Sequence, residues 1–318
     1  MLSLYLHVPF CASKCRYCGF YSTQYDSAQA DAFLTALAKE MHLCSNEIDA
    51  KVFKTLYIGG GTPTVLSIAQ MQSLMHLIHE HTRMSEDAEF TVEANPNSLS
   101  PAMLSLFREQ GVNRISIGVQ SFFPDILAWL GRVHTASDAE KAVEAARTAG
   151  FDNIGVDLIY GIPGLSGVRW RETLKKAVEL RPNHISAYSL SVDEGSKLQR
   201  EMPSGNTELP GDDVTAEHYE DTVEFLDAAG YHQYEISNFC LPRHECKHNL
   251  NYWDRGEYVG LGPGAWSFSG NRRRRNVADL EAYLRELDQD RSPADFEETL
   301  DISQAAVETV FLGLRKTE

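Results

Sequence analysis

Three cysteines close to the N-terminus are the residues of this chain best suited to chemistry. Cys11, Cys15 and Cys18 follow a C-x3-C-x2-C spacing, and no fourth cysteine comes directly after them. A [4Fe–4S] cluster normally takes one thiolate for each of its four irons. Three thiolates on one short loop therefore predict a cluster in which one iron stays open to a small ligand.

Two other interpretations of these cysteines are weaker. Free cysteines often pack as small apolar side chains, but half of the six cysteines of this chain fall within the single run 11–18. A zinc knuckle usually needs a second pair of ligands at short spacing, and nothing near the cysteine loop supplies one. We therefore expect iron at this loop.

The elements that must position the loop form a repeated strand–helix pattern. Helical periodicity predicts helices over about 28–45, 68–82, 101–110, 137–149 and 168–180. Apolar, β-branched runs between them predict strands over 2–8, 55–58, 89–93, 114–119, 153–159 and 184–189. Strands that alternate with helices indicate a parallel sheet. We expect an α/β fold built on an incomplete, parallel (β/α)6 TIM-like barrel.

A different pattern begins near residue 206. A polar stretch over 204–213 leads into a helix over about 214–229, and a region rich in aromatics, glycines and turns follows. We predict two domains, a partial barrel over 1–205 that carries the cluster and a smaller α+β accessory region over 206–318 that covers the barrel. The predicted helix over 302–315 ends without a capping residue, so we expect a truncation before a C-terminal domain.

Composition narrows the class of protein. The 318 residues carry a formal net charge of -16, which argues against nucleic-acid binding because phosphate contacts need a basic face. The one basic run, Arg272 to Arg275, is expected to be a solvated loop. No run approaches the ~20 apolar residues of a membrane span, and the start lacks the basic flank of a signal peptide. We expect a cytoplasmic protein, in which thiols stay reduced and bind metals.

Polar residues gather where the predicted strands end. Function in parallel barrels collects at the C-terminal ends of the strands. The cysteine loop follows the first strand, and a glycine-rich loop over 59–64, whose backbone can approach a ligand closely, follows the second. Glu93, Gln120 and Asp157 lie in or after later strands. Such groups are costly to bury without partners, so we expect a polar ligand in the barrel mouth.

The cysteine spacing, Tyr17 before the third cysteine and the glycine-rich loop resemble the radical S-adenosylmethionine (SAM) superfamily. Further motifs resemble its branch of oxygen-independent coproporphyrinogen III oxidases, namely Y-x-H-x-P-F-C over 5–11, G-V-Q-S-F over 118–122, L-G-R over 130–132 and D-L-I-Y-G-I-P over 157–163. The resemblance implies that the open iron chelates SAM through its amino and carboxylate groups, and that a reduced cluster cleaves SAM to a radical.

Position within these motifs implies a set of site residues. Cys11, Cys15 and Cys18 would hold the cluster. The residues implied to contact SAM are Tyr5, Tyr17, Gly60, Gly61, Thr62, Glu93, Gln120, Arg132, Asp157 and Ala187. Carboxylates in this set can accept from amino or hydroxyl groups, and an arginine can pair with a carboxylate. No residue is assigned a catalytic role.

Two departures from the oxidases bring the chain closer to a neighbouring family. Phe20 stands where the oxidases have a further cysteine, and the N-terminal extension that they carry is missing before Cys11. The HemW-type haem chaperones share both departures, together with an H-N-x-x-Y-W run that here covers 248–253. The resemblance therefore implies haem as cargo, with His248 as a candidate haem ligand.

Other roles remain open at this stage. The chain could instead catalyse oxidative decarboxylation as a coproporphyrinogen III oxidase, or act as a radical SAM methyltransferase of the same branch. His248 and its aromatic neighbours could equally pack the second domain against the barrel. Haem, SAM and recipient apo-haemoproteins are the expected partners. A homodimer and peripheral association with membrane haemoproteins are left open.

Overall fold

The fold is described from a computed structural model that covers residues 1–48, 51–202 and 208–317. Within these ranges one sheet has the strand order β14-β13-β12-β11-β1-β4-β5-β6-β7-β8-β10-β9, and β2 pairs with β3 apart from it. The strands are β1 (Leu2–Val8), β2 (Phe10–Cys11), β3 (Thr23–Gln24), β4 (Val52–Gly60), β5 (Arg83–Ala94), β6 (Arg114–Gln120), β7 (Ile154–Tyr160), β8 (His184–Ser189), β9 (His232–Glu235), β10 (Asn238–Cys240), β11 (Glu257–Leu261), β12 (Trp266–Ser269), β13 (Arg272–Asn276) and β14 (Ala294–Thr299).

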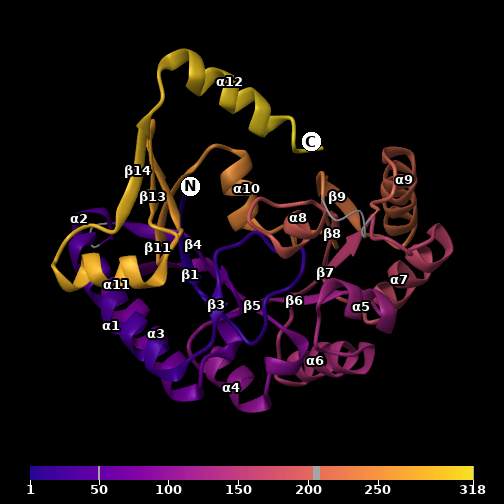
Figure 1. The fold of residues 1–318 in the computed structure, drawn as a ribbon, viewed down its shortest axis with the longest axis horizontal. Coiled ribbons are helices and arrows are strands. Elements are labelled where there is room, and N and C mark those ends of the chain that lie inside the picture. Colours follow the sequence, from indigo (N-terminus) through magenta and orange to yellow (C-terminus); the bar gives the residue numbers. More distant parts are fainter. Residues whose placement is uncertain (49–50, 203–207, 318) are drawn as a thin grey trace.

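Parallel strands β1, β4, β5, β6, β7 and β8 form the partial barrel, as the sequence predicts. Helices cover its outer face (Figure 1). The α-helices in the described part of the chain are α1 (Ser27–Leu43), α2 (Ser45–Ile48), α3 (Ile68–His81), α4 (Pro101–Glu109), α5 (Pro124–Leu130), α6 (Ala136–Thr148), α7 (Gly167–Glu179), α8 (Lys197–Glu201), α9 (Asp212–Ala228), α10 (Lys247–Trp253), α11 (Leu280–Asp288) and α12 (Ile302–Gly313).

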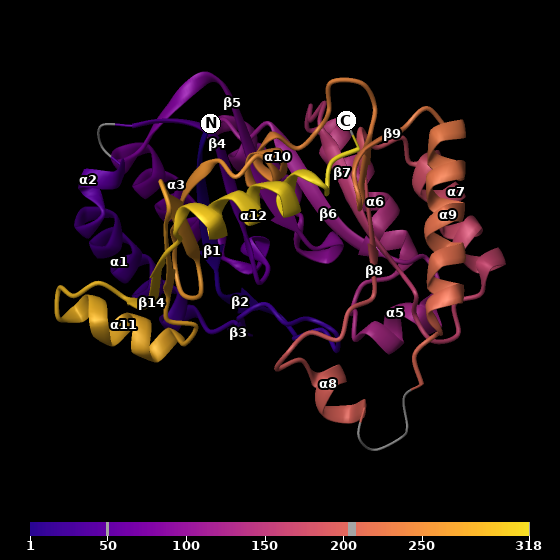
Figure 2. The same cartoon turned by 90° about the horizontal axis from the view of Figure 1, so that it is seen from above.

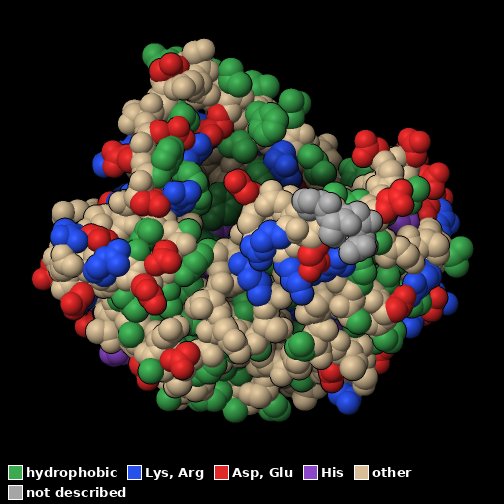
Figure 3. All heavy atoms as spheres, viewed as in Figure 1, with side chains coloured by type: hydrophobic (Ala, Val, Ile, Leu, Met, Phe, Trp, Pro, Cys, Tyr) green, Lys and Arg blue, Asp and Glu red, His purple; other side chains and the backbone are tan. Residues whose placement is uncertain are grey.

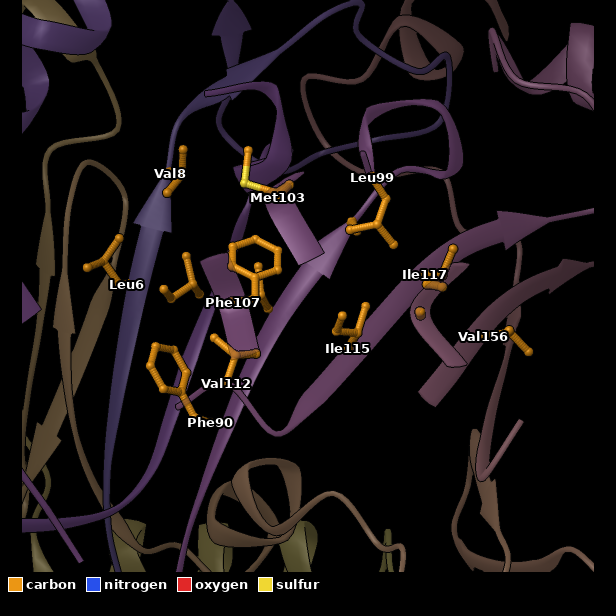
Figure 4. Close-up of a cluster of buried hydrophobic side chains, with 14 of the residues drawn as sticks. Leu6, Val8, Phe90, Leu99, Met103, Phe107, Val112, Ile115, Ile117 and Val156 are labelled. Carbon is orange, nitrogen blue, oxygen red and sulfur yellow. The ribbon is translucent and has the colours of Figure 1, made fainter. Parts of the chain in front are cut away.

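Apolar side chains fill the layer between the barrel strands and the outer helices. Phe107 of α4 lies beside Val112, and Phe90 of β5 and Ile115 of β6 line the same layer (Figure 4). Local signals in the sequence set the helix ends, as in α3, where Ser67 and Gln70 form a capping box. This packed wall holds the strand ends, and the loops that follow them, in fixed positions.

Residues after 208 extend the same sheet at both edges. Strand β11 pairs in parallel with β1, while β10 pairs antiparallel with β8. The predicted boundary between 205 and 206 lies outside the described residues, so the division into two domains stays a prediction. No helix in the described part of the chain is long and apolar enough to cross a membrane.

The basic run is a strand, and the prediction of a solvated loop there is wrong. Arg272–Asn276 forms β13 between β12 and β14. Opposite-charge partners accompany the four arginines: Arg272 with Glu297, Arg273 with Glu298, Arg274 with Glu47, and Arg275 with Asp295. Glu297, Glu298 and Asp295 stand on β14, and opposite charges on neighbouring strands stabilise pairing. Glu47 approaches from α2. These partners explain why four consecutive cations can form a strand here.

Helix α12 runs across the open side of the barrel (Figures 1 and 2). It follows β14 at one end of the sheet. Beyond its C-terminus, the carbonyl of Arg315 accepts from the amide of Ile236, and Lys316 forms a β-bridge with Glu235 of β9. The helix thus joins the two ends of the sheet, and we call it the α12 strap.

Candidate functional site

A cavity of about 520 Å³ lies inside the partial barrel at the C-terminal ends of its strands. Its walls come from the cysteine loop and from side chains that alternate along the barrel strands. The predicted site residues that line it are Cys11, Cys15, Cys18, Tyr17, Gly60, Gly61, Thr62, Glu93, Gln120, Arg132 and Asp157. Residues more than a hundred positions apart are therefore brought to one pocket.

The cysteine loop is held by backbone hydrogen bonds to its surroundings. Strands β2 and β3 pair across its base, and the amide of Arg16 donates to the carbonyl of Leu130 at 3.0 Å. The amide of Gly19 donates to the Asp193 carboxylate at 3.1 Å. These contacts fix the path of the loop without using the three thiols, which are half-buried and free.

The glycine-rich loop packs directly against the cysteine loop. The amides of Gly61 and Thr62 donate to the carbonyls of Val8 and Phe10 at 2.8 and 2.7 Å. A Cβ on Gly61 would come within 2.5 Å of the Phe10 carbonyl oxygen, and Gly60 has φ +109. Both glycines are therefore required for the close approach of the two loops. An ammonium group only donates hydrogen bonds, so the loop can bind one only through its carbonyl oxygens.

Hydrogen bonds from three strand-end loops converge on the cysteines. Arg132 donates to Asn95 Oδ1 and to Cys15 Sγ, the latter at 3.5 Å. Asn95 Nδ2 donates to Thr62 Oγ1 at 3.1 Å, and Thr62 Oγ1 donates to Cys11 Sγ at 3.7 Å. Donors that point at sulfur favour thiolates over thiols.

The donor set fits an iron–sulfur cluster. Burial raises the pKa of Cys11 and raises that of Cys18 to about 11, while the Thr62 hydroxyl and the Phe20 amide oppose the shifts. Thiols of this kind stay protonated unless a metal takes the thiolates. Cys11, Cys15 and Cys18 would hold the cluster, and Arg132 and Thr62 would supply hydrogen bonds to its sulfur ligands.

Two partly buried carboxylates face the same cavity. Tyr57 donates to Glu93 Oε1 at 2.7 Å, and burial raises the pKa of Glu93 to about 7. Ser116 donates to both oxygens of Asp157 at 3.1 and 3.2 Å, and burial raises the pKa of Asp157 also. Carboxyls in this state can accept hydrogen bonds from amino and hydroxyl groups of a polar ligand.

Gln120 ends β6 in an unusual backbone conformation. Its φ is 64, in the left-handed region, and the register against β7 shifts between Gly118 and Gln120. Non-glycine residues in this region store strain that the surrounding structure must offset. The result is a buried amide side chain that lines the cavity beside Arg132.

Three predicted residues do not line this cavity. Ala187 is buried in β8. Tyr5 and His248 instead line a second cavity of about 600 Å³. The two cavities share parts of their walls, including Phe20, Tyr57 and Glu93. Figure 3 shows a hollow on the open side of the barrel, below the α12 strap, with hydrophobic side chains in its wall.

Aromatic rings dominate the second cavity. His248 sits on α10, which contacts β1 and β4, and its ring lies 5.0 Å from the rings of both Tyr57 and Tyr252. Both nitrogens of His248 have protein partners, since Nδ1 lies 2.8 Å from Thr55 Oγ1 and Nε2 lies 3.0 Å from the Tyr252 hydroxyl. The further aromatic rings in the wall are those of Tyr21, Tyr188, Tyr258 and Trp266.

Sequence reasoning missed several cavity residues. Tyr57, Arg114 and Ser116 line the first cavity but were not among the predicted site residues. Arg114, Ser116 and Gly118 stand at alternate positions of β6, the periodicity that sends side chains to one face of a strand. Polar residues at every second position of an otherwise apolar parallel strand are the signal that could have found Arg114 and Ser116.

Together, the partial barrel and the three-cysteine mouth define a protein of the radical SAM class. The model of the Radical SAM superfamily matches residues 5–177. Coproporphyrinogen III oxidase HemN of Escherichia coli, described as a radical SAM enzyme, superposes with a TM-score of 0.89 at 26% identity, over 99% of this chain and 75% of that one.

Curated relatives narrow the class further. The protein named heme chaperone HemW of Bacillus subtilis is 40% identical over 100% of this chain and 84% of its own length. Its namesake of Mycobacterium tuberculosis is 39% identical over 98% of this chain and 81% of its own length. The chain belongs to the HemW family of the radical SAM superfamily.

Proposed function

We propose that this protein binds haem and delivers it to apo-haemoproteins, with a [4Fe–4S] cluster and SAM bound at the barrel mouth. The observation that carries the proposal is the aromatic second cavity, which contains His248 and shares a wall with the cysteine-lined cavity. Flat aromatic and apolar walls suit a porphyrin face, and a histidine is a common axial ligand of haem iron. The names of the relatives from Bacillus subtilis and Mycobacterium tuberculosis support the same cargo.

The first cavity would bind the cluster and SAM through side chains of this chain. Cys11, Cys15 and Cys18 would hold the cluster, which when bound supplies an electron to SAM. Glu93 and Asp157 would accept from the amino and hydroxyl groups of SAM, and Arg132 would orient the loops around them. The deep position of this pocket would keep water away from the bound SAM.

One charged residue in the second cavity suits the propionates of haem. Arg275 lines this cavity, lies over the Trp266 ring and pairs with Asp295. Arg272, on the same strand, pairs with Glu297 in the same way but does not line the cavity. The two arginines therefore form a matched pair for testing where haem binds.

The test compares haem affinity among variants of the cluster-loaded protein. Arg275→Ala should weaken haem binding, whereas Arg272→Ala should leave it unchanged, as measured by titration of the Soret band. Transfer to an apo-haemoprotein should fall with binding. Equal affinities for wild type and both variants would contradict the proposed location.

Oxidation of coproporphyrinogen III is the second candidate, favoured by the superposition on the Escherichia coli oxidase. Phe20 opposes it, because it stands where the oxidases have a further cysteine. Incubation with SAM, reductant and either haem or coproporphyrinogen III separates the roles. Haem uptake and transfer without altered porphyrin supports delivery. Vinyl-bearing product would support the oxidase, and methylated product a methyltransferase.

Further parts of the proposal concern where the protein works and with what. We propose a cytoplasmic protein whose recipients are apo-haemoproteins, including any at the membrane surface. We expect no nucleic-acid partner, in line with the net charge of -16. Sedimentation of the loaded protein distinguishes a monomer from a homodimer.

A further inference from the structure

A second group of metal-binding side chains lies at the far end of the sheet from β14. His232 and Cys240 are direct partners in the antiparallel pairing of β9 with β10. Residues opposite one another in such a pair project to the same face. Glu245 joins them from the segment that leads from β10 into α10. The three side chains thus come from one short stretch of chain, residues 232–245.

The ligand atoms lie within 4.8 Å of one another. Cys240 Sγ is 3.5 Å from His232 Nε2, which is 3.0 Å from Glu245 Oε1. Zinc bonds of about 2.3 Å to sulfur and about 2.1 Å to nitrogen imply a tetrahedral sulfur–nitrogen edge of about 3.6 Å, and a nitrogen–oxygen edge of about 3.4 Å. The observed separations are close to these edges before any ion is bound.

We propose that His232, Cys240 and Glu245 form a binding site for Zn²⁺, with a fourth position open to water. The combination of imidazole, thiolate and carboxylate is typical of zinc ligands. The His232 and Glu245 side chains are 38% and 32% exposed, which gives an ion a path to the site. This inference does not depend on haem or SAM binding.

Binding would release a proton. Zinc binds cysteine as the thiolate, so formation of the zinc–sulfur bond would displace the Cys240 thiol proton to solvent. No electron is transferred.

The site would also stabilise the approach to α10. The amide of Leu241 donates to the carbonyl of Asn183 at 2.9 Å, and the amide of His244 donates to the carbonyl of Leu241 at 3.1 Å. An ion bound to both Cys240 and Glu245 would crosslink the two ends of the segment that connects β10 to α10. We therefore expect zinc to raise the melting temperature of the protein.

The test uses protein with its iron–sulfur cluster reconstituted, so that Cys11, Cys15 and Cys18 are occupied. ZnCl₂ is titrated, and zinc is counted after removal of loosely bound metal. Wild type should retain one zinc ion. His232→Gln and Glu245→Gln should each weaken zinc binding by roughly 10–100-fold or more, since loss of a contact that only supports a metal ligand already has an effect of that size. Cys44→Ser is the matched control, because Cys44 is another buried cysteine that contacts Arg274 rather than this group.

A spectroscopic measurement adds a second readout. CoCl₂ in place of zinc should give a thiolate-to-cobalt charge-transfer band in wild type and Cys44→Ser, and no such band in Cys240→Ser. If Cys240→Ser fails to fold, His232→Gln and Glu245→Gln still test whether zinc binds here, because both side chains are partly exposed. Equal zinc content and affinity in wild type, His232→Gln and Glu245→Gln would overturn the proposal.

Discussion

The two nitrogens of His248 differ in what they can offer a haem iron. Thr55 Oγ1 donates to Ser3 Oγ at 2.7 Å, so it is left to accept from Nδ1–H of His248. Nε2 then accepts from the Tyr252 hydroxyl. Burial lowers the pKa of His248 to about 3, which keeps the ring neutral. Nε2 thus carries the lone pair that a haem iron would need, but this lone pair already accepts a hydrogen bond from the Tyr252 hydroxyl.

This arrangement makes Tyr252→Phe informative. Loss of the hydroxyl frees Nε2 without emptying the aromatic wall, so haem affinity should stay equal or increase, whereas His248→Ala should abolish the histidine-ligated Soret spectrum. Titration with haem at constant pH measures both. A Tyr252→Phe variant that binds haem several-fold more weakly, or a His248→Ala variant with an unchanged spectrum, would exclude His248 as the ligand.

The pKa of Glu93 predicts how SAM binding depends on pH. Burial raises this pKa to about 7, so Glu93 is mostly a neutral acid below that pH. An ionised carboxylate accepts hydrogen bonds from SAM more strongly, and bound SAM would therefore lower the pKa. SAM affinity should increase as the pH rises from 6 to 7 and level off above 8.

Glu93→Gln supplies the control for this prediction. Glutamine keeps the size of the side chain and an acceptor for Tyr57, but it does not titrate. Its SAM affinity, measured by calorimetry on cluster-loaded protein, should be flat between pH 6 and 8. The same pH dependence in wild type and variant would assign the titration to another group.

At the scale of elements, much of the fold could be predicted from local patterns. The six barrel strands and their helices follow from apolar runs and 3.6-residue periodicity, and Ser67 and Gln70 mark the start of α3. The strand at 272–275 could not be predicted, because four arginines pair there only with carboxylates that are distant in the sequence. The position of α10 also depends on a distant residue, Glu89.

Glu89 holds the start of α10 against the barrel. Its Oε2 accepts from the amide of Lys247, and its Oε1 accepts from the amide of His248, both at 3.0 Å. Glu89→Gln replaces one acceptor oxygen by an NH₂ group, which leaves a buried amide unpaired. We expect a loss of ~1–3 kcal/mol in the free energy of unfolding, measured by urea denaturation. We also expect weaker haem binding, because His248 would move when the start of α10 is no longer held.

Glu86→Gln is the matched control on the same strand. Glu86 is exposed, so its substitution should change the free energy of unfolding by less than about 0.5 kcal/mol. If Glu89→Gln is as stable as Glu86→Gln, the carboxylate of Glu89 does not position α10.

At the scale of the whole molecule, the cysteine-lined cavity could be predicted in outline and the second cavity could not. Residues at the C-terminal ends of parallel strands lie at one edge of the sheet regardless of loop conformation. The positions of Glu93 and Asp157 could therefore be predicted from the strand pattern. The second cavity needs α10 packed against β1 and β4, and it needs β11, β12 and β13 added in that order beyond β1. These arrangements arise from contacts such as Thr55 with His248, which no local periodicity encodes.

The α12 strap completes the molecule by joining the ends of the sheet, and Glu308 anchors it. Glu308 pairs with Arg255 at 2.8 Å and also with Arg273, and its side chain is only 20% exposed. Glu308→Gln should cost ~1–2 kcal/mol in the free energy of unfolding, since two guanidinium groups each lose one of their partners in a partly buried setting. Glu297→Gln, at the exposed pair with Arg272, should cost less than about 0.5 kcal/mol.

Hydrogen exchange should quicken in 302–313 for Glu308→Gln alone. Equal exchange in both variants would show that this ion pair does not hold the strap across the barrel.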